Sequence, residues 1–162
     1  MTATEMSKNE PDNSVSYFAE RVKTLSKGDL TALRRAFSGT LTEASGAALA
    51  AFYKICPKDV KKEETAYLAA CAIAYILHYG NGKKSFANCL KQAEVSESRV
   101  KALLSNKSID RDGFFHTKYS RLVRYTVSKG YLPDINEIYP ALSDWWKYRL
   151  GLTKEFFHEN NK

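Results

Sequence analysis

The segment AYLAACAIAYILHY, residues 66–79, decides the fold that this sequence predicts. It is apolar on almost every side of a helical projection, which is typical of a central helix that other helices surround. Its apolar run from Ala66 to Leu77 is too short to cross a lipid bilayer. We expect Asp59 to begin this helix and the turn at residues 80–82 (Gly-Asn-Gly) to end it.

Apolar residues at helical spacing predict three helices before this segment. We expect Gly28 to end the first of them and Asp29 to cap the second. The polar residues 1–13 lack such spacing and are predicted to form a flexible N-terminal arm. The three helices are expected at residues 14–25, with Asn13 or Ser14 as the cap, at residues 29–37 and at residues 47–55.

Helical spacing continues after the turn, at residues 85–93, 96–104 and 112–128. Asp134 and Glu137 have the spacing of a capping box, Pro140 is expected to kink the helix they open, and a break is expected near Gly151. No segment alternates with the period of a strand. The prediction is an all-α protein of about eight helices in two small helical bundles, an N-terminal one at residues 14–92 and a C-terminal one at 93–162.

The charge of the chain is unevenly distributed. Its 162 residues include 25 Lys and Arg against 18 Asp and Glu, a net charge of +7. Residues 83–129 hold 11 basic and four acidic residues, whereas residues 1–82 have a balance of +1 and the remaining 33 residues one of −1. A basic block of this kind favours a polyanionic partner, either nucleic acid or an anionic membrane surface.

Composition narrows the class of protein further. An apolar content of 44% is enough for a sizeable core and excludes wholesale disorder. Cys56, Cys71 and Cys89 are odd in number and have apolar or helical neighbours, so we expect buried, reduced thiols rather than disulfides. No basic stretch followed by an apolar run begins the sequence, so no signal peptide is expected. These features predict a cytoplasmic protein with no membrane segment.

The sequence predicts neither a catalytic nor a metal site, and no cofactor. His78, His116 and His158 are far apart and lack a Cys or acidic partner at ligand spacing. Glu63 and Glu64 are adjacent on a helix and point in different directions, so a solvated, charge-balanced first turn explains them. Nucleophile-elbow, Walker-type and dinucleotide-binding glycine motifs do not occur in the sequence. We therefore do not expect an enzyme.

Basic residues on the predicted helix at 112–128 give the strongest functional signal. Lys118, Arg121 and Arg124 fall on one side of that helix, away from its apolar stripe. A row of like charges is unfavourable unless an anion covers it, although an ordinary solvated face is the alternative. Further basic candidates for nucleic-acid contact occur along the chain: Arg34, Arg35, Lys61, Lys62, Lys83, Lys84, Arg99, Lys101, Lys147 and Arg149.

Some of these candidates have a second interpretation. Arg35 faces solvent on its predicted helix, but Arg34 lies at the edge of the apolar face, where packing or a carboxylate partner explains it as well as phosphate binding does. Lys61 and Lys62 lie in a first helical turn, where cations oppose the helix dipole and so favour a bound anion. At positions 145 and 146, two adjacent Trp residues differ by 100° around a helix. We expect one in the core and one at a subunit contact.

Residues 85–105 also fit a helix-turn-helix, with Arg99 and Lys101 near the start of its second helix. Packing alone produces the same spacing in many helical corners. A stand-alone DNA-binding regulator that reads DNA through Ser96 to Leu104 is therefore an alternative. A third class, an architectural adaptor, would use its basic face only for acidic protein partners.

Several short segments, in this order, resemble the small subunit (CasB) of the type I-E CRISPR effector complex, Cascade. The resemblance covers roughly residues 14–160. The segments are ALRRAF at residues 32–37, FYKICP at 52–57, SFANCL at 85–90, ESRVKALL at 97–104, YSRLV at 119–123 and DWW at 144–146.

The resemblance implies two helical bundles, no enzymatic activity and a role in antiviral defence. Members of this family assemble as a pair within Cascade beside the guide RNA, and they present basic residues to the target and non-target DNA strands, which stabilises the open R-loop. The basic positions of the family map best onto Arg34, Arg99 and Arg121. At residues 105–108, SNKS replaces an Arg- and Asp-rich turn of the family, so the phosphate contacts of that turn are not carried over.

Overall fold

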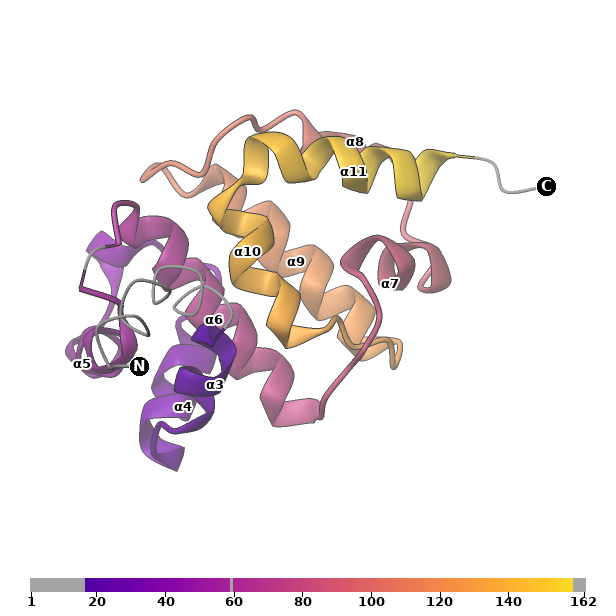
Figure 1. Cartoon of the computed structure of the whole chain (residues 1–162). Helices are drawn as coiled ribbons and strands as arrows, with labels where there is room; N and C mark the ends of the chain where they lie inside the picture. Colours follow the sequence, from indigo (N-terminus) through magenta and orange to yellow (C-terminus); the bar gives the residue numbers. More distant parts are fainter. Residues whose placement is uncertain (1–16, 59, 159–162) are drawn as a thin grey trace, which may run out of the picture.

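The computed structural model describes residues 17–58 and 60–158. The predicted arm at residues 1–13, the predicted caps Asn13 and Ser14, and Asp59 lie outside these residues. Within them the chain forms nine α-helices and two short 3-10 helices, with no strand (Figure 1). The all-α prediction is confirmed. No helix in the described part of the chain is both long enough and apolar enough to cross a membrane.

Helix α6 (Glu63–Tyr79) is the centre of the fold, as its sequence predicts. Every residue from Thr65 to Ile76 is buried, because other helices cover α6 on several sides (Figure 1). The covering helices are α3 (Phe18–Lys23), α4 (Lys27–Arg35), α9 (Phe114–Ser128) and α10 (Ile138–Ser143), with α5 (Gly46–Ile55) packed on α4.

A single hydrophobic core runs through the molecule. Its buried residues extend from Phe18 to Leu152, and the rings of Phe18 in α3 and Tyr139 in α10 lie 4.2 Å apart. The core is therefore continuous across the boundary that the sequence predicts between residues 92 and 93. The two predicted bundles share one interior.

Helix α11 (Trp145–Phe157) packs on α7 (Phe86–Gln92). The indole N–H of Trp145 donates to the carbonyl oxygen of Asn106 at 2.7 Å, and its ring meets Phe115 at 4.8 Å. Trp145 is buried, whereas Trp146 is 59% exposed. The prediction that one of the two lies in the core is confirmed.

The boundary between the first two helices differs from the prediction. Ser26, rather than Asp29, caps α4, because its extended backbone lets its hydroxyl accept the Asp29 N–H at 3.1 Å. Gly28 consequently lies inside the first turn of α4 instead of ending α3. The Asp29 carboxylate is held by Lys54 at 2.7 Å.

The expected break near Gly151 is also wrong. The chain breaks at Asp144, whose backbone (φ −128°, ψ 51°) is not helical, and Gly151 lies within α11. Pro140 falls in the first turn of the six-residue α10, where a missing N–H costs no helical hydrogen bond, so it produces no kink in a longer helix.

The predicted capping box at Asp134 forms only in part. The Asp134 carboxylate accepts the Asn136 N–H at 2.9 Å and opens the 3-10 helix η2 (Ile135–Glu137). The Asp134 N–H donates to the Lys84 carbonyl oxygen instead of to Glu137. A backbone hydrogen bond thus joins the segment before α7, at Lys84, to the segment before η2, at Asp134.

The turn after α6 explains why a glycine occupies position 82. A Cβ atom at Gly82 would lie 1.8 Å from the backbone oxygen of Leu132, so no other residue fits without movement of the backbone. Gly80 has a φ of +145°, which L-amino acids with side chains rarely adopt. The turn at residues 80–82 therefore locks the end of α6 against the chain that follows α9.

The three cysteines are free thiols, as expected, and Cys71 and Cys89 are buried, but Cys56 is only half-buried, which differs from the prediction. Burial raises the pKa of Cys56 and Cys89 to about 11 and that of Cys71 to about 12. At pH 7.5 a thiol of pKa 11 is roughly 0.03% thiolate, the nucleophilic form. In a DTNB assay we expect Cys71 and Cys89 to stay unmodified in the native protein and all three thiols to react in denaturant. Rapid native labelling of two or more thiols would contradict this packing.

Candidate nucleic-acid interface

A groove with a volume of about 740 Å³ lies where α6, α8 (Glu97–Leu104) and α9 meet. Four cations from two helices line it, together with two tyrosine rings, and none of its lining residues is acidic. The lining residues are Tyr75, Arg99, Ala102, Lys118, Arg121, Leu122, Arg124, Tyr125 and Ser128. We call this feature the α8–α9 groove.

The spacing of residues in α9 puts its cations in this groove. Positions 118, 121 and 124 are three residues apart and so follow one side of the helix. The opposite side carries the buried stripe that includes Phe115, Tyr119 and Val123. Gly113 (φ +85°) and the Asp112 carboxylate, which accepts the Phe114 N–H at 3.0 Å, set the start of the helix. Lys118 and Arg124 are half-buried, and Arg121 is exposed.

Arg124 is part of the folded scaffold as well as of the groove. Its guanidinium donates to the carbonyl oxygen of Phe37 at 2.7 Å. It also lies over the rings of Tyr75 and Phe37, at 4.8 and 5.4 Å from their centroids. The predicted row of three cations lies on one side of α9, but its members differ: Arg124 is tied to α6 and to the end of α4, while Arg121 is exposed.

Replacing Arg124 by Ala is expected to lower the free energy of unfolding by about 2 kcal/mol, since it removes a charge-assisted hydrogen bond and two cation–π contacts. Arg121→Ala, one turn earlier, should change stability by less than about 0.5 kcal/mol. Urea unfolding of both variants checks this. Equal effects would mean that Arg124 has no structural role.

Arg99 completes the other wall of the groove. Ser96 caps α8 by accepting the Arg99 N–H, and the exposed Arg99 guanidinium lies 5.6 Å from the centroid of the Tyr125 ring. Lys129 lies 5.4 Å from the same ring. Lys101, on the same helix, is 4.0 Å from Glu97 and does not line the groove.

No protein family model, curated protein or solved structure matches this chain. What the α8–α9 groove binds is therefore inferred from its own side chains. Spaced cations attract the phosphates of a nucleic-acid strand, and exposed aromatic faces can stack on bases. The groove offers mainly the first kind of contact, because Tyr75 is buried beneath Arg124 and the half-buried Tyr125 ring has Arg99 and Lys129 near it.

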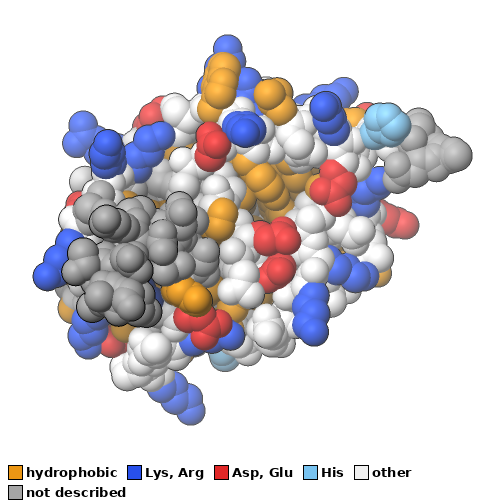
Figure 2. Space-filling view, in the orientation of Figure 1, with side chains coloured by type: hydrophobic (Ala, Val, Ile, Leu, Met, Phe, Trp, Pro, Cys, Tyr) orange, Lys and Arg blue, Asp and Glu red, His pale blue; other side chains and the backbone are white. Residues whose placement is uncertain are grey.

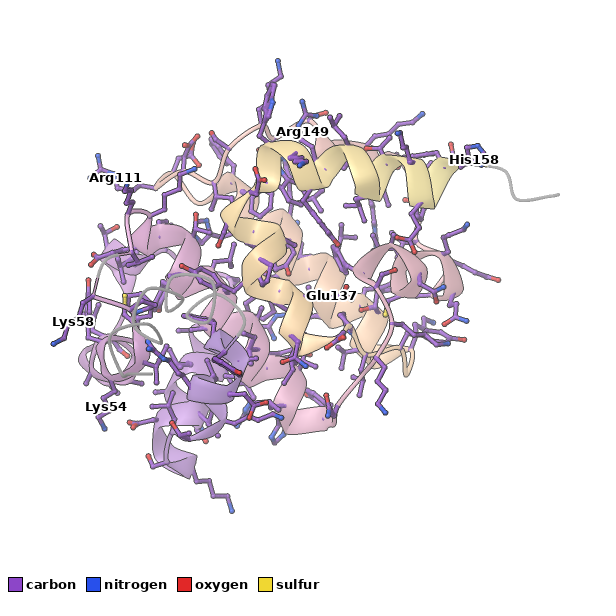
Figure 3. All side chains as sticks on the ribbon, viewed as in Figure 1. Lys54, Lys58, Arg111, Glu137, Arg149 and His158 are labelled. Atoms are coloured by element: carbon purple, nitrogen blue, oxygen red, sulfur yellow. The ribbon has the colours of Figure 1, made fainter. Side chains whose placement is uncertain are left out.

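The other predicted basic residues lie outside this groove. Arg149 is half-buried, donates to the Leu104 carbonyl oxygen at 3.1 Å and covers Trp146, so it closes the end of α8. In Figure 3, Arg149 lies on α11, and Lys58, which follows α5, lies well away from it, so basic residues are spread over distant parts of the surface. Lys84 donates to Gln92 at 2.7 Å. The exposed side chains of Lys83 and Lys147 have no ion pair with described residues.

The N-terminal candidates also lie apart from the groove. Arg34 is half-buried and Arg35 is exposed, as the helical projection predicts. Arg35 lines a different cavity, beside α4 and α5. Lys61 and Lys62 border a cavity of about 210 Å³ with Tyr139 and Ser143. The predicted cations that converge in the α8–α9 groove are thus Arg99, Lys118, Arg121 and Arg124.

Carboxylates gather on a different part of the surface. Figure 2 shows a face with Asp and Glu near its middle and others toward its edges, where most of its Lys and Arg also lie. Glu137 lies in the middle of the same view (Figure 3). Burial, and then the neighbouring Asp134 and Glu155 carboxylates, raise the pKa of Glu137. Asp134, Glu137 and Glu155 are not among the residues that line the α8–α9 groove.

One buried polar contact has no signal in the sequence. The Glu64 carboxylate accepts the Leu41 N–H at 2.6 Å and lies 2.9 Å from the Nε2 atom of His116. The His116 ring is fully buried, and only 12% of the Glu64 side chain is exposed. The solvated first turn predicted for Glu63 and Glu64 is therefore wrong for Glu64, and His116 has an acidic partner that lies far from it in sequence.

This contact is structural rather than metal-binding. Nowhere in residues 17–58 and 60–158 do three His, Cys, Asp or Glu side chains gather closely enough to hold a metal ion. Glu64 instead joins three elements: α6, α9 and the 3-10 helix η1 (Leu41–Glu43). It fixes the N-terminal end of α9 against the central helix.

Proposed function

We propose that this protein is a non-catalytic, sequence-independent nucleic-acid-binding subunit, of the kind that serves as the small subunit of a type I-E Cascade. One observation carries the proposal: cations from α8 and α9 converge in one groove that no carboxylate lines. A subunit that accepts any target sequence needs contacts to phosphate rather than to base edges. The four cations of the groove can supply such contacts.

The physics of R-loop formation fits a modest binding surface of this kind. Exchanging a DNA duplex for a guide–target heteroduplex is nearly balanced in free energy, so a few phosphate contacts can tip it. In this proposal the partners are other Cascade subunits, guide RNA, both DNA strands and a second copy of the chain, in the cytoplasm. The groove itself would hold one strand.

Salt dependence tests the binding mode. Four phosphate contacts to a single strand give a slope of about −2.8 for log K against log salt, or an affinity loss of roughly 50-fold between 50 and 200 mM salt. Fluorescence anisotropy with several unrelated oligonucleotides measures this loss. Similar affinities with a steep salt slope support the proposal, and an affinity independent of salt contradicts it.

A reconstituted complex tests the cellular role. We expect R-loops formed by a type I-E Cascade that contains this chain to dissociate more slowly than those formed without it. The measurement is the lifetime of the open DNA in a permanganate or gel assay. Equal lifetimes with and without the chain would exclude the Cascade role while leaving DNA binding itself intact.

The structure also keeps the helix-turn-helix alternative worth testing. A tight turn joins α7 and α8, with Glu94 in the left-handed conformation (φ 58°) and the Val95 N–H donating to Leu90. Arg99 and Lys101 project outward from α8. A stand-alone regulator would prefer one sequence over random competitor by about 10³-fold or more. A competition gel-shift against random DNA separates the two functions.

A further inference from the structure

The cavity beside Lys61 and Lys62 lies where the start of α6 faces α10. Its volume of about 210 Å³ is many times the ~10–15 Å³ that one water molecule needs, so a tetrahedral anion fits. None of the described residues that line it is acidic. We call it the α6–α10 cavity. Its lining residues are Val60, Lys61 and Lys62 before α6, Thr65 in the first turn of α6, and Tyr139 and Ser143 of α10.

Thr65 is a buried polar residue that lines this cavity without a partner. Only 3% of it is exposed, and its hydroxyl forms no hydrogen bond with a described residue. Most hydroxyls buried this deeply are paired. The Ser143 hydroxyl, across the cavity, also lacks a partner, but its oxygen is fully covered, whereas the Thr65 oxygen is not. The unpaired Thr65 hydroxyl therefore indicates a polar occupant.

Positive groups surround this hydroxyl. The side chains of Lys61 and Lys62 are exposed and have no ion pair with described residues. No side chain caps α6, and the first hydrogen bond of the helix runs from the Ala66 N–H to the Lys62 carbonyl oxygen. The three N–H groups before Ala66 consequently have no acceptor within the helix. Such N–H groups, together with the helix dipole, attract an anion.

The two carboxylates in the first turn of α6 serve other partners. Glu63 accepts a hydrogen bond from the Tyr53 hydroxyl at 2.9 Å. Glu64 accepts the Leu41 N–H and contacts the buried His116 ring. Neither Glu63 nor Glu64 lines the α6–α10 cavity. On the cavity side, the start of α6 thus presents two ammonium groups, backbone N–H groups and a hydroxyl.

We propose that the α6–α10 cavity binds a phosphate group, which belongs either to a nucleic-acid backbone or to a small phosphate compound. A phosphate accepts hydrogen bonds through several oxygens, and each of the polar groups on the α6 side can donate one. The cavity shares no lining residue with the α8–α9 groove. The proposal is therefore independent of the function proposed for that groove.

Isothermal titration of the full chain with inorganic phosphate, at constant ionic strength, tests the site. The double change Lys61→Gln and Lys62→Gln should weaken binding by about tenfold or more, because two charge-assisted contacts are lost. The matched control, Lys27→Gln with Lys147→Gln, removes two exposed lysines that have no ion pair with described residues, and it should leave the affinity unchanged. An absence of saturable binding up to about 20 mM phosphate, or full binding by the Lys61 and Lys62 variant, would overturn the proposal.

Thr65→Val separates binding from folding, because valine keeps the shape of the side chain and removes the hydroxyl. We expect the affinity for phosphate to fall about fivefold, whereas the melting temperature of the free protein should not fall, since a buried hydroxyl without a partner does not stabilise the fold. Unchanged affinity in this variant would contradict the proposed site.

A variant with a disabled α8–α9 groove, Arg99→Glu with Arg121→Glu, identifies the source of the phosphate. We expect this variant to bind inorganic phosphate as the unchanged protein does. If an oligonucleotide without terminal phosphates displaces inorganic phosphate from it, the ligand is a nucleic-acid backbone. If the oligonucleotide does not displace it, the ligand is a small phosphate compound. Loss of phosphate binding in this variant would place the phosphate in the groove and overturn the proposal.

Discussion

Replacing both Arg99 and Arg121 by Glu is expected to weaken nucleic-acid binding by roughly 100-fold or more. Each cation can make a charge-assisted contact to phosphate worth about 1.5 kcal/mol or more, and the two losses add to about two decades of affinity. The slope of log K against log salt should also fall in magnitude by about 2, because two fewer phosphates are neutralised. Anisotropy titrations at several salt concentrations measure both quantities.

A control with the same change of charge keeps this result specific to the α8–α9 groove. Lys27, the first residue of α4, and Lys58, which follows α5, are exposed and have no ion pair among the described residues. The double change Lys27→Glu and Lys58→Glu should cost less than threefold in affinity. If the two double variants bind equally weakly, total charge rather than the groove determines binding, and the proposed site is wrong.

Glu64→Ala is expected to lower the free energy of unfolding by about 3 kcal/mol. The Glu64 carboxylate serves both the Leu41 N–H and the buried His116 ring, and each buried group left without a partner costs about 1–3 kcal/mol. Removal of Glu64 leaves both unpaired. Chemical unfolding monitored by circular dichroism gives the free energy directly.

The neighbouring residue provides the control. Glu63 is exposed, and among the described residues its carboxylate accepts one hydrogen bond, from the exposed Tyr53 hydroxyl at 2.9 Å. Glu63→Ala removes the same charge from the same helical turn and should change stability by less than about 0.5 kcal/mol. Equal losses in the two variants would show that helix-terminal charge, and not the His116 contact, is what stabilises this end of the fold.

The sequence predicted the central helix well because its apolar residues surround the whole circumference. Such a pattern is typical of a helix that others surround, and α6 is buried from Thr65 to Ile76. Helix ends were predicted less well. Ser26 and Asp29 are both good capping residues, and the choice between them depends on Lys54, which lies far away in sequence. The break at Asp144 likewise follows from the packing of α10 and α11.

The candidate site was predictable in part for the same reason. The spacing of Lys118, Arg121 and Arg124 is a local property of one helix. The sequence therefore predicts that the three side chains lie on the same side of that helix. That Arg99 and Tyr75 join them depends on how α6 and α8 pack, which local spacing does not encode. The Glu64–His116 contact joins residues of two separate helices and carries no local signal at all.

The position of α6 has a consequence for how the chain is made in the cell. Its apolar surface leaves the ribosome early, but α9 and α10, which cover one side of it, follow only with residues 114–143. Until then the nascent chain exposes the hydrophobic surface of α6 on that side. Exposed hydrophobic surface of this kind is bound by chaperones and promotes aggregation. The hydrophobic core of the N-terminal part is therefore complete only once α9 and α10 have packed on α6. A chain whose synthesis stops before residue 143 would leave this surface exposed to chaperones and proteases.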